Sequence, residues 1–159
     1  MATLYLVSTP IGNLDDLTRR AERVLAEVDR VLAEDTRRTR ILLEHLGLRK
    51  PLTSCHEHNE AARTETVLGW LADGEDVALV SDAGTPLISD PGERLVEAVS
   101  GAGYDVVPIP GPSAVTAALA VSGLPPEPFT FLGFVPRKGR DRRTALERIA
   151  GSRETIVVF

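Results

Sequence analysis

Short apolar runs alternate with amphipathic stretches along most of the chain. Between the apolar runs, hydrophobic residues recur every three or four positions, which is the spacing of one face of a helix. The pattern predicts strands at Leu4–Ser8, Val31–Ala33, Leu52–Ser54, Val77–Ser81 and Asp105–Ile109. It predicts helices over residues 14–28, 39–46 and 59–74, a fourth that begins at Asp90, and a fifth from residue 113 to near Gly123.

This alternation predicts an α/β fold with a mostly parallel, Rossmann-like sheet and helices on both faces. Parallel neighbours need crossover connections, and helices usually supply them. Several of the strands are apolar throughout, as strands covered on both faces must be. Asn59 and Asp90 are the expected helix caps, Pro91 follows Asp90 in the first helical position, and Gly47 and Gly74 end two helices.

The balance of basic and acidic residues changes at residues 122–128, a rigid stretch that contains three prolines. Residues 1–124 carry 11 basic and 19 acidic side chains, whereas residues 125–159 carry 7 and 4. We therefore expect an N-terminal domain over residues 1–124, and a linker and the start of a second α/β domain over 125–159. There Phe129–Phe134 and Thr155–Phe159 read as strands and Arg142–Ala150 as a helix. So small a piece cannot bury a core of its own, which predicts a truncated second domain.

Composition narrows the functional classes. Hydrophobic residues make up 43% of the chain and its formal net charge is −5, which excludes general disorder and a uniformly basic nucleic-acid coat. Aromatic residues make up only 4%, which argues against a base-stacking sheet. No apolar run is long enough for a membrane span, and the N-terminus leads directly into a strand. We expect a cytoplasmic protein with no membrane partner.

Three loops rich in Gly and Pro follow predicted strands: Thr9–Asn13, Ser81–Gly92 and Ile109–Ser113. In an open parallel sheet, ligands bind outside the carboxyl ends of the strands. Gly permits a close backbone approach and Pro stiffens a loop, so together the loops predict a rigid cradle for a ligand. Helix N-termini that follow such loops favour an anionic or polar group. Taken singly, each loop is also explained as an ordinary turn.

The loops carry neither G-x-G-x-x-G nor G-x-x-x-x-G-K-[ST], so a standard dinucleotide site and an ATP or GTP phosphate loop are not expected. Asp82 directly follows the clearest strand and is read either as a ligand contact or as a turn-stabilising side chain. His56 and His58 have metal-like spacing, but no third strong ligand is nearby and we predict no metal. Cys55, the one cysteine, reads as a buried, unreactive thiol.

Two charged stretches have a functional and a structural reading. The run Glu34–Arg40 is either a solvated helix start or a polar wall that faces a phosphate-bearing substrate. The run Arg137–Arg143 is the densest basic stretch, and it is either a solvated face or a contact to an RNA backbone.

Read together, these motifs resemble the bacterial small-subunit ribosomal RNA methyltransferases that modify the 2′-oxygen of a cytidine ribose, members of the tetrapyrrole methylase superfamily. The matching stretches occur in family order. They are Leu4–Leu14, Ala33–Arg37, His56–Glu60, Ala78–Gly92, Val107–Ala114 and Phe131–Pro136.

The resemblance implies S-adenosylmethionine as methyl donor and small-subunit ribosomal RNA, or the 30S subunit, as substrate. It also implies a homodimer for the full-length protein. Carried over by motif, the cofactor contacts are Pro10, Ile11, Gly12, Asp82, Ala83, Gly84, Thr85, Pro86, Ile88, Gly111, Pro112, Ser113 and Ala114. On the substrate side we expect residues of Glu34–Arg37 and His56–Glu60 together with the basic run. The residues assigned there are Glu34, Asp35, Arg37, His56, His58, Asn59, Arg137, Lys138 and Arg140.

Methyl transfer to a hydroxyl needs alignment above all, and a general base can assist. Glu34, Asp35 and His58 have suitable chemistry, and the sequence does not choose among them. Two other functions stay open. One is a methyltransferase of the same superfamily that acts on a tetrapyrrole or another small molecule. The other is a non-catalytic module that binds cofactor or RNA.

Overall fold

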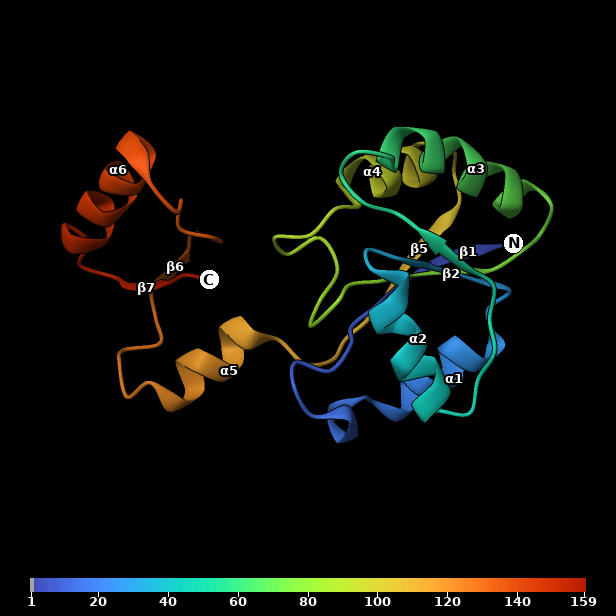
Figure 1. The fold of residues 1–159 in the computed structure, drawn as a ribbon, viewed down its shortest axis with the longest axis horizontal. Helices are drawn as coiled ribbons and strands as arrows, with labels where there is room; N and C mark the ends of the chain where they lie inside the picture. The colour runs from blue at the N-terminus through green and yellow to red at the C-terminus, as the bar shows by residue number, and fades with distance from the viewer. Residues whose placement is uncertain (1) are drawn as a thin grey trace. The chain divides into compact units, whose positions relative to one another are not determined.

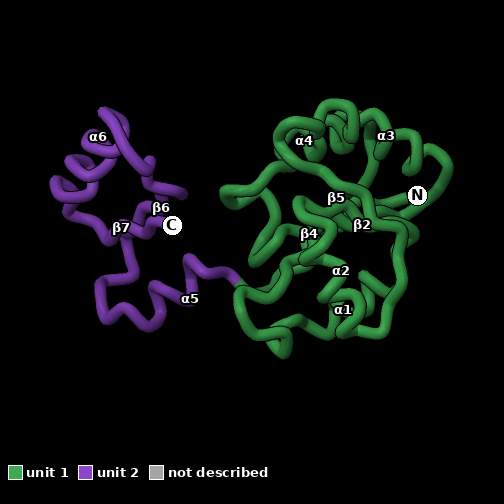
Figure 2. Tube along the Cα trace, viewed as in Figure 1, with its two compact units in different colours: residues 1–112 green, residues 113–159 purple. Residues whose placement is uncertain are grey.

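The computed structural model describes residues 2–159, which form two compact units, residues 2–112 and 113–159 (Figure 2). The composition change at residue 125 places the boundary later than this compact division, which assigns the helix at residues 114–121 to the second unit. The domain limit at residue 124 stays a prediction.

The first unit is built on a five-stranded, fully parallel sheet in the order β3-β2-β4-β1-β5. β4, in the centre, is buried along its whole length. The expected α/β class is thereby confirmed, and each strand lies at or within one residue of its predicted range. The strands are β1 (Thr3–Val7), β2 (Arg30–Ala33), β3 (Leu52–Ser54), β4 (Val77–Val80) and β5 (Asp105–Ile109).

Two helices cover each face of this sheet (Figure 1). α1 and α2 bury Val24, Leu25 and Leu42 against one face. α3 and α4 bury Val67, Leu71 and Leu95 against the other. The helices are α1 (Arg19–Glu27), α2 (Thr36–His45), α3 (Glu60–Ala72) and α4 (Glu93–Gly101), with a 3₁₀ turn η1 (Leu14–Asp16) before α1.

The helix predicted over residues 14–28 is wrong at its beginning, because two caps divide it. The Asn13 side chain accepts from Asp15 N at 3.2 Å and starts η1, and Thr18 Oγ1 accepts from Ala21 N at 3.1 Å and starts α1. The apolar spacing runs through both segments, so periodicity alone does not reveal the break.

The predicted cap of α4 is also wrong. The helix begins at Glu93, and its N-cap position is Gly92 with φ +129°, not Asp90. A Cβ on Gly92 would come within 2.8 Å of the Leu79 side chain, so the backbone lies closer to the sheet here than another residue would allow. The Asp90 carboxyl is thus left for other contacts.

The second unit pairs β6 (Phe129–Phe131) with β7 (Thr155–Val157) in parallel and adds α5 (Ala114–Val121) and α6 (Gly139–Ala150). Both strands are shorter than predicted, and α6 begins three residues earlier. Its buried cluster is small: Val115, Leu119 and Val157, with Phe131 packed against them.

Candidate cofactor and substrate site

The first and second Gly/Pro-rich loops bond directly to each other. They follow β1 and β4, which are neighbours in the sheet, so their carboxyl ends leave the same edge. Thr9 N donates to Gly84 O at 2.9 Å and Gly84 N donates to Thr9 O at 3.0 Å. Thr9 Oγ1 adds a bond to Ser81 O at 3.1 Å. These bonds hold the two loops in one arrangement.

The third loop joins the other two through hydroxyl groups. Ser8 Oγ donates to Thr85 Oγ1 at 3.2 Å, and Thr85 Oγ1 donates to Pro112 O at 3.5 Å. Ser8 N also donates to Ile109 O at 3.2 Å. The prediction that the three loops meet at one edge of the sheet is confirmed.

Glycine is favoured at two positions in these loops, for different reasons. A Cβ on Gly111 would lie 2.9 Å from the Ser8 Cβ, closer than real carbon atoms approach. Gly84 has φ +86°, which favours glycine, and its Cβ position lies 3.5 Å from the Ile11 side chain. Backbone therefore forms much of the surface here.

The residues predicted to contact a cofactor differ in exposure. In the first unit the exposed ones are Gly12, Ala83, Ile88 and Gly111, the half-buried ones Pro10, Ile11, Asp82, Thr85 and Pro112, and the buried ones Gly84 and Pro86. Ser113 and Ala114 belong to the second unit, at the start of α5.

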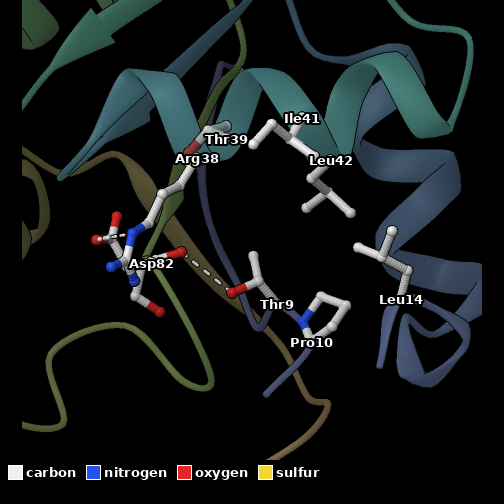
Figure 3. A pocket seen from close by; sticks show the side chains of 9 residues that line it. Thr9, Pro10, Leu14, Arg38, Thr39, Ile41, Leu42 and Asp82 are labelled. Carbon is white, nitrogen blue, oxygen red and sulfur yellow. Dashed lines mark hydrogen bonds and ion pairs between the residues drawn. The ribbon is translucent and has the colours of Figure 1, made fainter. Parts of the chain in front are cut away.

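Asp82 joins the β4 loop to the loop after β2. Its Oδ1 accepts from Asp35 N at 3.0 Å, and its Oδ2 lies 3.5 Å from Arg38 Nε. The side chains of Asp82 and Arg38 face each other in Figure 3. The Asp82 carboxylate thus holds the loop after β2 and does not stabilise its own turn through these bonds, and it is only half-buried.

Asp35 is the N-cap of α2. Its carboxylate accepts from Arg37 N at 2.9 Å and is also paired with the exposed Arg37 guanidinium at 2.7 Å. Hydrogen bonds from Arg37 lower the pKa of the Asp35 carboxyl to about 2. The helix-start reading of Glu34–Arg40 is therefore correct for Asp35 and Arg37, and so low a pKa makes Asp35 a poor proton acceptor.

A small pocket of about 130 Å³ opens between the first loop and α2 (Figure 3). Several residues that line this pocket are not among the predicted site residues. Their three- to four-residue spacing along α2 is that of side chains packed in the core. The sequence signal that could have revealed the pocket is Ile41, an apolar residue that lies outside this stripe. In the structure its side chain is 61% exposed. The lining residues are Thr9, Pro10, Leu14, Arg38, Thr39, Ile41, Leu42, Ser81 and Asp82. The volume is below that of a complete small-molecule site.

On the opposite helix layer, a second pocket of about 320 Å³ is strongly acidic. It is lined by Glu34, Glu57, Glu60, Ser89, Asp90, Pro91, Gly92 and Glu93. Burial, and then the nearby charges of Glu34 and Asp82, raise the pKa of Asp90 to about 6. Burial and the charge of Asp82 likewise raise the pKa of Glu34. Glu34, Asp82 and Asp90 thus interact electrostatically.

The turn before α3 holds the histidine motif. His56 N donates to Asn59 Oδ1 at 2.8 Å, so the Asn59 side chain closes the turn and does not cap α3 by a hydrogen bond. His58 is exposed and its ring lies 6.0 Å from that of His56. Within residues 2–159, no group of three or more His, Cys, Asp or Glu side chains is arranged to hold a metal ion. Burial raises the pKa of the Cys55 thiol to about 11.

Glu60 is the last residue of this motif and is expected on the substrate side. Its carboxylate instead bonds to the start of α4. The residue is only 8% exposed, and its carboxylate accepts from backbone N–H groups at the start of α4. These amides are therefore already occupied, and the expectation that an anionic ligand binds at this helix N-terminus is wrong for α4.

The basic run lies in the second unit. Arg137, Lys138 and Arg140 are exposed, and Lys138 occupies the N-cap position of α6. Arg142 Nη1 donates to Pro136 O at 3.1 Å. The run is thus a solvated surface whose guanidinium and ammonium groups are accessible.

Among the helices of residues 2–159, none is long and apolar enough to cross a membrane.

Comparison with known proteins gives consistent matches. The sequence matches the tetrapyrrole (corrin/porphyrin) methylases over residues 3–159. It is 53% identical over 157 residues to the ribosomal RNA small subunit methyltransferase I of Xylella fastidiosa, covering 99% of this chain and 58% of that protein. It is 50% identical over 156 residues to the Escherichia coli O157:H7 protein of the same name, covering 98% and 54%.

The chain thus spans little more than half the length of these relatives. In three dimensions it resembles diphthine synthase, with a TM-score of 0.74 and 17% sequence identity, covering 99% of this chain and 64% of that one. At that identity the likeness concerns the fold alone.

Proposed function

The chain belongs to the tetrapyrrole methylase family, and from this premise we propose that it serves an S-adenosylmethionine-dependent methyltransferase of small-subunit ribosomal RNA. The proposed reaction is methylation of the 2′-oxygen of a cytidine ribose. The names of its relatives support the RNA substrate. Action on ribosomal RNA, in free form or in the 30S subunit, also supports a cytoplasmic location, and the family resemblance supports a homodimer.

The observation that carries the proposal is the interlocked set of loops after β1, β4 and β5. Their mutual hydrogen bonds fix a surface made largely of backbone, and the glycines leave it open to close approach. Such a surface suits a nucleoside-containing cofactor, whose hydroxyl and amino groups need fixed N–H and C=O partners. The residues that would hold S-adenosylmethionine are Pro10, Ile11, Gly12, Asp82, Ala83, Gly84, Thr85, Pro86, Ile88, Gly111, Pro112, Ser113 and Ala114.

The charge at this edge also fits a cofactor with a cationic centre. S-adenosylmethionine, when bound, supplies a methyl group carried on a positively charged sulfur. Glu34, Asp82 and Asp90 interact electrostatically at the carboxyl ends of β2 and β4. A cation close to them would relieve their mutual repulsion and lower the pKa values of Glu34 and Asp90.

Between the two carboxylates among the candidate bases, Glu34 suits the reaction better than Asp35. The 2′-hydroxyl would give its proton to the Glu34 carboxylate while its oxygen forms the bond to the methyl carbon; the bond from that carbon to sulfur would break, and the electron pair would stay on sulfur. A general base works best when its pKa lies near the working pH, and the pKa of Glu34 is raised. Asp35, with its pKa near 2, would hold that proton poorly.

The remaining polar residues would bind RNA. Arg37, His56, His58 and Asn59 flank the same edge of the first unit, and Arg137, Lys138 and Arg140 present positive charge in the second. Guanidinium and ammonium groups bind phosphates and make such affinity dependent on salt. Neutralising the three basic residues of the second unit should therefore weaken RNA binding and flatten its salt dependence.

A calorimetric titration with S-adenosylhomocysteine, with NAD as the control ligand, tests the cofactor assignment. Selective binding of S-adenosylhomocysteine supports the proposal, whereas binding of NAD alone, or of neither ligand, contradicts the assignment of these loops. Methyl transfer by a full-length relative, measured on 30S subunits and on a porphyrinoid, then decides between RNA and tetrapyrrole substrates. In that assay Glu34→Gln should lower kcat, and an unchanged kcat would remove Glu34 as the base.

A further inference from the structure

Glu60 makes an unusual set of contacts for a residue at the start of a helix. Its Oε1 accepts from Gly92 N at 3.1 Å, Arg94 N at 3.0 Å and Leu95 N at 3.3 Å. These donors lie 32–35 residues away in the sequence, on the first turn of α4. A carboxylate at a helix N-terminus forms charge-assisted bonds and interacts favourably with the helix dipole. Glu60 of α3 therefore caps α4.

The segment that enters α4 needs such support. Leu87 and Ser89 have φ values of +71° and +69°, in the left-handed region that non-glycine residues rarely adopt. Such a conformation is strained for a residue with a Cβ and persists only where its surroundings hold it. Gly92 follows at φ +129° and has no side chain with which to cap the helix. The Glu60 carboxylate bonds the backbone where this strained segment ends.

The backbone of Glu60 is fixed in turn to the histidine motif. Glu60 N and Asn59 N both donate to His56 O, at 3.0 and 2.9 Å. His56 N is held by Asn59 Oδ1 and Asn59 Nδ2 donates to Ser54 O at 3.3 Å. One residue thus connects the turn at His56–Asn59 with the end of the long loop after β4.

We propose that Glu60 is a positioning residue: its buried carboxylate holds the loop Ser81–Gly92 in the conformation that binds the cofactor and couples that loop to the turn His56–Asn59. This inference rests on the proposed function, because that function assigns the loop to the cofactor. Glu60 itself does not touch the reacting groups. It acts through the backbone of Leu87–Gly92.

The test compares Glu60→Ala and Glu60→Gln with Glu65→Ala, which removes an exposed carboxylate from the same helix. Glu60→Ala should weaken S-adenosylhomocysteine binding at least tenfold. Glu60→Gln keeps an acceptor oxygen without the charge and should restore part of the affinity. Glu65→Ala should bind as the unchanged chain does. Equal affinities for Glu60→Ala and the unchanged chain would overturn the proposal.

Two further measurements separate positioning from general loss of stability. Leu71→Ala removes a buried side chain from α3, 2% exposed, and leaves the hydrogen bonds of the Glu60 carboxylate to α4 in place. If it lowers the melting temperature as Glu60→Ala does and costs the same affinity, Glu60 is merely structural. Amide hydrogen exchange should accelerate at Leu87–Leu95 in both Glu60 variants and not in Leu71→Ala. Because Glu60→Gln keeps an acceptor, it serves if Glu60→Ala does not fold.

Hydrogen exchange also distinguishes the failure of this inference from failure of the proposed function. If the unchanged chain does not bind S-adenosylhomocysteine, the cofactor assignment fails. Faster exchange confined to Leu87–Leu95 in Glu60→Gln would then still show that Glu60 holds the loop. Unchanged exchange there, with cofactor binding intact, would overturn the role of Glu60 alone.

Discussion

The loops after β1, β4 and β5 and those after β2 and β3 leave the same edge of one parallel sheet, but they are built differently. The first group is joined by backbone and hydroxyl hydrogen bonds, such as the Thr9–Gly84 pair and the Ser8–Thr85 bond. The second group carries titratable side chains, among them Glu34, Asp35 and His58. Asp82 bonds one group to the other.

The difference indicates two kinds of sensitivity. Where backbone forms the surface, shape depends on the absence of side-chain atoms, so an added methyl group should do the most harm. Where carboxylates and imidazoles form it, behaviour depends on protonation, so pH and salt should matter most. Variants on the two sides should therefore respond differently to the same measurements.

Gly111→Ala should have the largest effect. Its new Cβ would lie 2.9 Å from the Ser8 Cβ, so β1 and the third loop would have to separate. Overpacking of this kind costs about 1–3 kcal/mol of unfolding free energy. Because the third loop would shift, affinity for S-adenosylhomocysteine should fall at least tenfold. Urea unfolding and calorimetry measure the two effects.

Gly69→Ala is the matched control. Gly69 lies inside α3, and a Cβ there meets nothing within 4 Å. Alanine favours a helix over glycine by up to about 1 kcal/mol, so this variant should be slightly more stable and should bind the ligand unchanged. Loss of binding in both variants would mean that the glycine at position 111 has no special role.

The sequence predicted the arrangement of the three loops because it depends on local signals and a topological rule. Alternating runs define the strand–helix units, and parallel strands bring their carboxyl ends to one edge. It predicted the cap of α4 wrongly because the cap is not local. Asp90 and Pro91 carry the local signature of a helix start, yet Glu60, distant in sequence, supplies the carboxylate.

Asp90→Asn should give the next largest effect; Asp90 belongs to the loop after β4, but its carboxyl interacts with the charge of Glu34 after β2. The pKa of Asp90 is raised to about 6, so the folded state binds a proton more tightly than the unfolded chain does. Stability therefore falls as pH rises from about 4 to about 6, and ionised Asp90 destabilises the fold above that range. The variant should be more stable at pH 7.5 by about 1 kcal/mol, a value reduced for solvent screening.

Thermal melts between pH 4 and 8 measure this effect. The advantage of Asp90→Asn should shrink as pH falls and be largely lost near pH 4, where the folded state holds Asp90 mostly protonated and the repulsion on its charge is gone. Asp105→Asn, at an exposed position that begins β5, removes the same charge elsewhere. An advantage of Asp90→Asn that does not vary with pH would contradict the electrostatic cause.

The Gly/Pro-rich loops were easier to predict from the sequence than the interactions among the charged residues. The Gly/Pro-rich loops could be recognised from the sequence, because glycine permits backbone conformations that other residues rarely adopt and proline fixes φ. The charged residues did not reveal which of them interact, since Glu34, Asp82 and Asp90 come together only through the order of the strands. The pocket beside Ile41 was missed because its walls share the spacing of buried core residues.

Asp35→Asn should have the smallest effect, and its pH dependence should have the opposite sign to that of Asp90→Asn. Asparagine caps a helix about as well as aspartate, so the variant keeps the bond from Arg37 N and loses only the charge that pairs with the Arg37 guanidinium. Since the pKa of Asp35 is lowered to about 2, its carboxylate stabilises the fold above about pH 4, and this stabilisation is lost between about pH 4 and 2. The melting temperature of the variant should thus lie slightly below that of the unchanged chain at pH 7, with the gap closing as the pH is lowered or salt is added.

Asp16→Asn, which removes an exposed charge from η1, controls for the change in net charge. A gap that widens as the pH is lowered would mean that Asp35, like Asp90, is destabilised by neighbouring negative charge, and the contrast between the Arg37-paired cap and the acidic pocket would fail.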